Sequence, residues 1–458
     1  MRVRAARQRP AIALGAGAAL GLLAGLGALA GCARPAPPPR AVVVVDLDTL
    51  RADRLGVYGN PRPTSPHLDA FAHGATRFDA AFAQAPYTLP SQVSIVTSLY
   101  PHSHGVVREK DRMGQQATTL AEAFRAAGWR TAAFVDGGYV SAPFGFDQGF
   151  ETFVDFQRAG VGASEAKIAA WLAERRDEPF LLFVHTYDTH TPYAPPEPFR
   201  SRFAAMVPAP SPGFEPTSEA LEAIRASQWT PPLRRLAPRD LDYALALYDG
   251  EIAFVDAWFG RLMRQLEETG LAGRAVVAVI SDHGEEFQEH GSLLHEKLYA
   301  TVTRVPWLIR TPGGVAGQVV SEPVETVDLM PTLLELAGVP LPPGLEGRSL
   351  AETVRRGAAP GPRPGLAHSP FWGEQRALVE GDLHLVLTLD RARIELYDHR
   401  ADPLEQVDLA GARPREAGRL VRAMRARVAA LPGRSVASNV SGLPPEVEAT
   451  LRALGYLR

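Results

Sequence analysis

The stretch Tyr87-Thr88-Leu89-Pro90-Ser91-Gln92, which runs on through Val96-Thr97-Ser98-Leu99-Tyr100-Pro101 to His104-Gly105, is the most informative part of the chain. Thr88 stands directly before Leu-Pro-Ser, a position that suits the N-cap of a helix. The amino end of a helix also helps to hold an anion, because its backbone N–H groups lack partners. We therefore expect Thr88 to cap a helix and to lie at an anion-binding site.

Strand-like runs alternate with helix-like stretches along most of the chain. This alternation predicts an α/β fold, in which a mostly parallel sheet is flanked by helices on both faces. The β-branched run Val42-Val43-Val44-Val45 is typical of a buried central strand. Further strands are predicted at residues 131–135, 180–184 and 275–280, and helices at residues 118–127 and 243–269.

Polar residues follow three of the predicted strands. Asp48 follows the first strand, His185 and His190 follow a second, and Asp282-His283 follow a third. In open α/β sheets ligands bind beyond the carboxyl ends of the strands. We therefore expect these acids and histidines to meet at one edge of the sheet.

The domain organisation is predicted from shifts in composition. Residues 41–358 form the large α/β domain, and residues 365–458 form a small C-terminal subdomain with antiparallel strands and a covering helix over residues 415–431. Residues 195–240 are rich in proline and predict a long insertion. Two interpretations of the insertion stay open, a wall or lid at the rim of the active site and a surface excursion without a role.

The amino-terminal segment predicts export. Residues 1–31 combine a basic start with an apolar stretch and end in Leu29-Ala30-Gly31, directly before Cys32. This pattern resembles a bacterial lipobox, in which the cysteine is lipidated, and residues 32–40 then form a Pro-rich tether. We expect an extracytoplasmic lipoprotein, anchored through Cys32 in the periplasm or at the cell surface. An ordinary signal peptide and an uncleaved anchor helix are the alternatives.

The segment from Tyr87 to Gly105 resembles the nucleophile segment of the sulfatase family of the alkaline phosphatase superfamily. In sulfatases this segment begins with a Cys or Ser that is oxidised to formylglycine, and an Arg follows four residues later. This chain has Thr88 and Gln92 at those positions, and its one cysteine is Cys32. A threonine cannot be converted to that aldehyde, so the resemblance implies the fold but a different nucleophile.

Other segments resemble the same family in order and spacing over residues 41–410. They are Asp48-Thr49-Leu50-Arg51-Ala52-Asp53-Arg54-Leu55-Gly56, Ser281-Asp282-His283-Gly284-Glu285, Arg304-Val305-Pro306, Asp328-Leu329-Met330-Pro331-Thr332, Leu396-Tyr397-Asp398 and Asp402-Pro403-Leu404-Glu405. The resemblance implies an alkaline-phosphatase-like sheet and a C-terminal domain built on a four-stranded antiparallel sheet. It also implies hydrolysis or transfer at a sulfate or phosphate ester with a divalent metal.

The chain departs from the sulfatase pattern at further positions. The acid pair that often opens the metal site is Asp48-Thr49 here. Sulfatases usually carry Gly-Lys-Trp-His where this chain has Asp136-Gly137-Gly138-Tyr139, so the Lys and His that would grip the sulfate are missing. Because candidate metal ligands remain, we expect chemistry other than that of formylglycine.

Asp48, Thr88, Asp282 and His283 form the predicted metal site. A bound dication would lower the pKa of the Thr88 hydroxyl, which could then attack phosphorus. The arrangement resembles the threonine-using members of the superfamily, such as phosphodiesterases of the nucleotide pyrophosphatase kind, phosphoethanolamine transferases and lipoteichoic acid synthases. A mixed oxygen and nitrogen shell favours zinc or manganese over calcium. Asp46 is a further candidate, either as a ligand or behind the ligands.

His190 and His295 match family positions that touch the ester or protonate the leaving group. An imidazole with a pKa near ~6.5 can donate a proton at neutral pH. With Thr88 they make up the predicted catalytic set. A second metal would need further ligands, for which the chain offers Asp188, His190, His290 and His295.

We therefore expect a hydrolase or transferase of phosphoesters that acts through Thr88. The alternatives are a sulfuric ester hydrolase without formylglycine and a catalytically silent member that binds a glycan or an anion. The expected partners are a phosphate or sulfate ester, with lipid and glycan esters included, and a bacterial membrane. The net charge of −3 and the lack of a basic block exclude a nucleic-acid partner.

Overall fold

The computed structural model describes residues 39–175, 177–228, 232–433, 436–440, 442–454 and 456. The predicted signal peptide, Cys32 and most of the predicted tether lie outside the described residues. Within these residues, no helix combines the length and the apolar character needed to cross a membrane.

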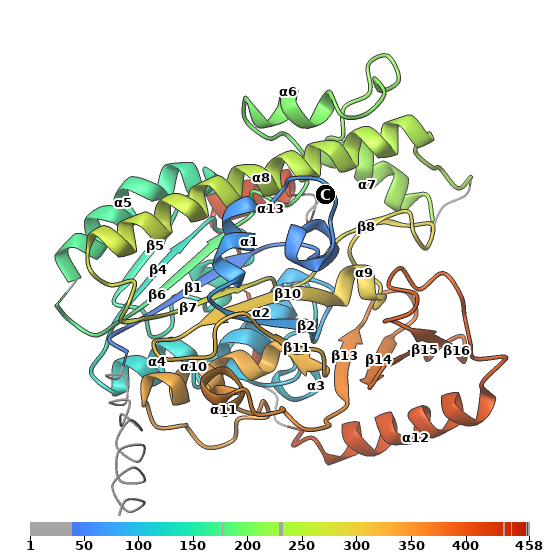
Figure 1. The fold of residues 1–458 in the computed structure, drawn as a ribbon. Coiled ribbons are helices and arrows are strands. Elements are labelled where there is room, and N and C mark those ends of the chain that lie inside the picture. The colour runs from blue at the N-terminus through green and yellow to red at the C-terminus, as the bar shows by residue number, and fades with distance from the viewer. Residues whose placement is uncertain are drawn as a thin grey trace, which may run out of the picture. The chain divides into compact units, whose positions relative to one another are not determined.

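The described residues form a central sheet of nine strands, with the order β11-β2-β10-β7-β1-β6-β4-β5 and with β12 paired to β2 (Figure 1). β1 (Ala41–Leu47) lies inside the sheet between two parallel neighbours, β6 (Phe180–Thr186) and β7 (Ala275–Ile280). All seven residues of β1 are buried, as its continuous β-branched run predicts. The register pairs Asp46 with His185, so the carboxyl ends of β1 and β6 coincide.

The other strands complete a mostly parallel sheet. β10 (Arg304–Arg310) runs antiparallel to both of its neighbours, β7 and β2 (Thr76–Phe82). The remaining strands of the sheet are β4 (Arg130–Val135), β5 (Thr152–Asp155), β11 (Gln318–Val320) and β12 (Val324–Glu325). The predicted fold class is confirmed.

Alternate residues of β1 point into two separate hydrophobic cores, because successive side chains of a strand face opposite sides of the sheet. Val42 and Val44 pack with α2 (Thr88–Thr97), α4 (Leu120–Ala126) and α10 (Leu329–Ala337). Val43 and Val45 lie in the other core, which contains α1 (Pro66–Ala72), α5 (Gly160–Arg175) and α8 (Pro238–Glu268). Figure 1 shows α5 and α8 on one side of the sheet and α4 and α10 on the other.

The small antiparallel sheet of the C-terminal part is also confirmed. Its strands are β13 (Gly365–Ser369), β14 (Gln375–Glu380), β15 (Leu383–Thr388) and β16 (Arg393–Asp398). The amphipathic helix α12 (Pro414–Ala430) packs its apolar face on this sheet through Leu420 and Met424. Its first residue is Pro414, which suits a position whose N–H would have no helical partner.

The structure shifts two predicted helix boundaries. The helix predicted from residue 243 begins earlier, at Pro238, again with proline at its start. The predicted insertion, residues 195–240, is therefore not all irregular: it contains α6 (Phe199–Ala204), α7 (Ser218–Ala226) and the start of α8. The helix predicted over residues 118–127 is shorter, because Thr119 caps it with a capping box.

Shorter elements connect these parts. They are the 3-10 helices η1 (Ala52–Arg54), η2 (Gly56–Tyr58), η3 (Ala142–Phe144) and η4 (Thr326–Asp328), the helices α3 (Pro101–His104), α9 (Ala300–Thr303), α11 (Ala351–Arg356) and α13 (Pro445–Ala453), and the strands β3 (Asp111–Met113), β8 (Glu286–Phe287), β9 (Leu293–Leu294) and β17 (Ala437–Asn439).

Candidate active site

The carboxyl ends of β1 and β7 bring the predicted metal ligands together. One ligand atom each of Asp48, Asp282 and His283 lies within 4.8 Å of the others, and all three side chains are fully buried. Asp282 is held by backbone donors, since its Oδ1 accepts from the N–H groups of His283 at 2.8 Å and Thr49 at 3.3 Å. The structure thus places these three residues where the strand ends predicted them.

Thr88, the first residue of α2, lies beside these three residues. Its Oγ1 lies 3.2 Å from Oδ2 of Asp48 and 3.2 Å from Nε2 of His283. The predicted N-cap role is wrong: the cap residue of α2 is Tyr87, and Thr88 is the first helical residue. Because the helix begins one residue earlier than expected, the hydroxyl points to Asp48 and His283 instead of to its own backbone.

The donor atoms of this group fit a divalent cation. Oδ1 of Asp48 and Oδ2 of Asp282 are buried and have no hydrogen-bond partner among the described residues. Burial, and next repulsion from Asp282, raises the pKa of Asp48 well above its usual range, and burial raises the pKa of Asp282. A cation held by the two carboxylates would contact the oxygens that lack a partner. Its positive charge would offset the free-energy cost of burying two negative charges.

Asp46 and Gln92 lie behind this group. Asp46 is two residues before Asp48 on the same face of β1, and Gln92 is one helical turn after Thr88. Both carboxylate oxygens of Asp46 and both amide atoms of Gln92 are buried, and the Gln92 side chain lies close enough to Asp46 to lower the pKa of that carboxyl in part. Burial and the charge of Asp282 raise the pKa of Asp46 well above its usual range. Asp46 is thus a third acid, after Asp48 and Asp282, that a nearby cation would stabilise.

The two predicted catalytic histidines meet at a residue that sequence reasoning missed. Nε2 of His190 lies 2.9 Å from the hydroxyl of Tyr456, and Nε2 of His295 lies 3.3 Å from it. The same hydroxyl lies 2.9 Å from Oγ1 of Thr88. The fold therefore gathers Thr88, His190 and His295 around one point, which the Tyr456 hydroxyl occupies. No motif around Tyr456 signals this position, because the residue reaches the site only through the docking of α13.

Burial favours the neutral form of the histidines around this point. Burial lowers the pKa of His190 to about 3 and that of His185 to about 3, and it lowers the pKa of His295 well below its usual range. Nδ1 of His190 donates to the carbonyl oxygen of Thr191 at 2.8 Å, which leaves Nε2 of the neutral ring as an acceptor. Nδ1 of His295 lies 3.1 Å from the Glu285 carboxylate. The Nδ1 contacts therefore orient both rings, and Nε2 of each ring faces the Tyr456 hydroxyl.

The segment that departs most from the sulfatase pattern has a structural role here. Asp136 accepts hydrogen bonds from Thr186 Oγ1 at 2.7 Å, from Tyr187 N at 3.1 Å and from Gly160 N at 3.1 Å. Tyr139 packs its ring against that of Tyr456, with the ring centroids 4.7 Å apart. The segment thus contributes aromatic surface to the site instead of a cation.

Part of the Pro-rich insertion lies at the mouth of the site. Glu222 and Arg225 of α7 line the same small cavity, of about 40 Å³, as His190, His295 and Tyr456. Arg225 forms an ion pair with Glu296, the residue after His295. α7 therefore connects the insertion to the segment that carries a predicted catalytic histidine.

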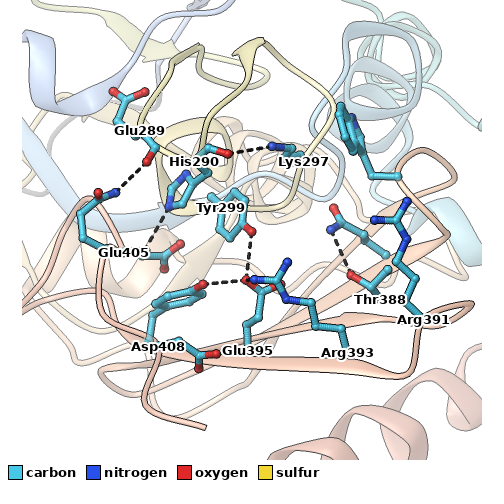
Figure 2. A pocket seen from close by; sticks show the side chains of 14 residues that line it. Glu289, His290, Lys297, Tyr299, Thr388, Arg391, Arg393, Glu395, Glu405 and Asp408 are labelled. Carbon is cyan, nitrogen blue, oxygen red and sulfur yellow. Dashed lines mark hydrogen bonds and ion pairs between the residues drawn. The ribbon is translucent and has the colours of Figure 1, made fainter. Parts of the chain in front are cut away.

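A larger cavity of about 370 Å³ lies elsewhere, between residues 289–299 and the strands β15 and β16 (Figure 2). None of Asp48, Thr88, Asp282 and His283 lines it.

Two of the residues considered for a second metal lie apart from the site. The ring of His290 lies at the larger cavity and stacks on Tyr299 at 3.6 Å, and Asp188 accepts from the backbone N–H of Val161 at 2.7 Å. Of the four residues considered for a second metal, the structure thus brings together His190 and His295.

Comparisons with known proteins give matches to both the sequence and the fold of this chain. A family model described as Sulfatase matches residues 40–339. An "Ulvan-active sulfatase" of Formosa agariphila is 26% identical over 81% of this chain and 77% of its own length, and an "Arylsulfatase" of Clostridium perfringens is 26% identical over 80% and 89%. A phosphonate monoester hydrolase from Silicibacter pomeroyi has a TM-score of 0.71 at 21% identity, over 86% of this chain and 96% of that one.

Proposed function

Because the chain belongs to the sulfatase family of the alkaline phosphatase superfamily and is an ester hydrolase of that family, we propose that it cleaves or transfers phosphoesters through Thr88. The observation that carries the proposal is the placement of Thr88 Oγ1 at 3.2 Å from both Asp48 Oδ2 and His283 Nε2. A buried threonine in contact with two candidate metal ligands has the surroundings that a weak nucleophile needs.

Asp48, Asp282, His283 and Thr88 would hold the cation, with zinc or manganese as the proposed metals. When bound, a dication lowers the pKa of a neighbouring hydroxyl and neutralises negative charge on an ester oxygen. Oδ2 of Asp48 lies 3.2 Å from Oγ1 of Thr88, within reach of the proton that the hydroxyl would give up. The Oγ–P bond would form as the bond from phosphorus to the leaving oxygen breaks, and the leaving oxygen would take up a proton from the protonated ring of His190 or His295.

His190 and His295 would receive the ester group beside Thr88. Their Nε2 atoms converge on the hydroxyl oxygen of Tyr456, at 2.9 Å for His190 and 3.3 Å for His295. An anionic ester at this point would raise the pKa of both imidazoles, because a nearby negative charge favours the protonated ring. The two histidines would then donate to the ester oxygens, and water or an acceptor hydroxyl would release the phosphothreonine.

The second candidate function is sulfate ester hydrolysis without formylglycine. The printed names of two relatives, an "Ulvan-active sulfatase" and an "Arylsulfatase", favour it. Thr88, Gln92 and the absence of the sulfatase-pattern Lys and His at residues 136–139 disfavour it. Binding of a glycan or an anion without catalysis is a third candidate. We also propose that lipidated Cys32 anchors the enzyme outside the cytoplasm.

The test is mass spectrometry of the full chain after incubation with zinc or manganese and, in separate reactions, an aryl phosphodiester, an aryl phosphomonoester and an aryl sulfate. We expect a phosphate adduct on the Thr88 peptide and none in Thr88→Val, which keeps the shape of the side chain without its hydroxyl. Turnover of aryl sulfate with Thr88 unmodified would support the sulfatase instead. If the protein takes up no metal and turns over no ester, the remaining candidate is a protein that binds a glycan or an anion without catalysis.

A further inference from the structure

The hydroxyl of Tyr456 lies where a substrate must bind. It is 2.9 Å from Oγ1 of Thr88, 2.9 Å from Nε2 of His190 and 3.3 Å from Nε2 of His295. Attack requires the reacting atoms to be about 3–3.5 Å apart. The phenol oxygen holds this place beside the nucleophile, so Tyr456 and an ester group exclude each other.

The ring of Tyr456 lies in a cage of other rings. Its centroid is 4.7 Å from that of Tyr139, 5.9 Å from that of Tyr87 and 5.4 Å from that of His190. These ring pairs are tilted or edge-to-face, as aromatic pairs prefer. Phe371 closes the cage behind Tyr87, at 5.6 Å between centroids. With Tyr456 in place, the cavity that remains measures about 40 Å³. Ligand pockets typically begin near 300 Å³, so the site is closed to substrate.

α13 holds Tyr456 in position. Leu451 and Val447 of this helix are buried in the core that contains α2 and α4, and the backbone N–H of Tyr456 donates to the carbonyl oxygen of Leu451 at 2.9 Å. Ser218 Oγ of α7 donates to the carbonyl oxygen of Ala453 at 3.0 Å. The phenol is therefore delivered by packing that lies outside the site.

We propose that Tyr456 is an intramolecular pseudosubstrate, and that its cage is the subsite for a phenol or a similar planar ring that carries the ester. The proposal rests on the proposed function, since it takes Thr88 as the nucleophile. The Tyr456 hydroxyl stands for the ester oxygen, and its ring stands for the group to which that oxygen is bonded. Substrate binds only when the phenol leaves, which weakens the apparent affinity by the fraction of time the site is open.

The experiment compares the full-length wild type with Tyr456→Ala and Tyr456→Phe, each loaded with zinc or manganese. Calorimetry measures the Kd for inorganic phosphate, and steady-state kinetics measure KM for an aryl phosphodiester. We expect Tyr456→Ala to lower both constants about tenfold, as for a site that is open one-tenth of the time in the wild type. Tyr456→Phe, which keeps the ring but loses the three hydroxyl contacts, should lie between the two. Glu448→Ala, on the exposed side of α13, is the matched control and should match the wild type.

The cage is tested by adding p-cresol, which is the tyrosine side chain as a free molecule. In Tyr456→Ala, p-cresol should inhibit competitively against the ester and raise the apparent KM toward the wild-type value. In the wild type, the inhibition constant for p-cresol should be at least about tenfold higher. Unchanged KM and phosphate Kd in Tyr456→Ala would overturn the proposal. A kcat that falls in both variants would also overturn it, because Tyr456 would then assist the reaction.

The two proposals fail in different ways. If no ester is turned over by any variant, the proposed function fails, but the phosphate Kd and calorimetric binding of p-cresol still decide whether Tyr456 fills the cage. If the wild type turns over phosphodiesters and p-cresol does not bind Tyr456→Ala, the pseudosubstrate fails and the function of Thr88 stands.

Discussion

Oγ1 of Thr88 lies 3.2 Å from Nε2 of His283, although 195 positions separate the two residues in the sequence. Thr88 begins a helix on one face of the central sheet, and His283 follows the buried strand β7. The pair meets because the amino end of α2 and the carboxyl end of β7 reach the same edge. This contact joins the candidate nucleophile to the candidate metal site.

Asp48→Asn should weaken the binding of zinc or manganese by about 100-fold or more, since even residues behind metal ligands are typically worth about 10–100-fold. The substitution removes a carboxylate charge but keeps the size of the side chain. Isothermal calorimetry on the metal-free protein measures the change. Asp136→Asn is the matched control, because Asp136 is an equally buried acid whose oxygens accept from backbone and threonine donors. Equal metal affinity in the two variants would exclude Asp48 as a ligand.

Glu296→Gln should raise KM about threefold to tenfold and leave kcat within about twofold. Glu296 pairs with Arg225 of α7 and accepts from Nε1 of Trp372 at 2.9 Å, so it shapes the mouth of the site and does not touch Thr88. A tenfold change corresponds to about 1.4 kcal/mol of binding. Steady-state kinetics with the best ester would measure both constants.

Arg200→Gln is the control for this prediction, because it removes an exposed ion pair with Glu215 in the same insertion. It should leave KM unchanged. If Glu296→Gln lowers kcat in proportion to kcat/KM, the residue acts in the transition state and not at the mouth.

Asp249→Ala should lower the free energy of unfolding by about 2–4 kcal/mol. Asp249 is fully buried and accepts from Arg54 at 2.6 Å and from Arg62 at 2.8 Å, so its loss leaves two cations without their partner. Breaking a buried pair typically costs about 3–5 kcal/mol, and the cost is smaller here because Arg62 reaches solvent. Glu352→Ala breaks a surface pair with Arg356 and should cost below about 1 kcal/mol in the same urea titration. Similar costs for both variants would contradict the prediction.

Asp256 should make the protein less stable as the pH rises from about 4 to about 7. Burial raises its pKa to about 7, whereas the unfolded chain releases this proton near 3.8, so the folded state holds the extra proton in this window. Stability therefore falls as pH rises through the window and stays lower above it. At about 1.4 kcal/mol per pKa unit, Asp256→Asn should reduce the loss between pH 5 and pH 8 by about 2 kcal/mol.

Urea denaturation at the two pH values measures this difference. Asp256 accepts from the backbone N–H groups of His67 and Leu68 at 3.0 and 2.8 Å, and the amide oxygen of asparagine can accept from the same donors. Asp242→Asn, at an exposed position of the same helix, should keep the wild-type pH dependence. Parallel pH dependence in the wild type and Asp256→Asn would show that Asp256 does not hold the proton.

The fold and the metal-site candidates were predictable because their signals are local. The run from Val42 to Val45 is apolar on both faces, and a strand with two apolar faces must be covered on both sides. Asp48 and Asp282-His283 follow such strands directly, so the sheet itself delivers them to one edge. The start of α8 at Pro238 and the cap of α2 at Tyr87 were missed, since both depend on a shift of a few residues in backbone conformation.

The α/β class, the family resemblance and the strand ends that carry Asp48, Asp282 and His283 can be read from the chain alone. Each of these follows from side-chain periodicity and from neighbours along the chain. The meeting of Tyr456 with Thr88, His190 and His295 appears only in the folded molecule, and so does the ion pair between Arg225 of the insertion and Glu296. These contacts join residues far apart in the chain, and no local pattern encodes them. They depend on the packing of two helices, because α13 buries Val447 and Leu451 in one core, α7 buries Leu221 in the other, and Ser218 of α7 donates to the carbonyl oxygen of Ala453.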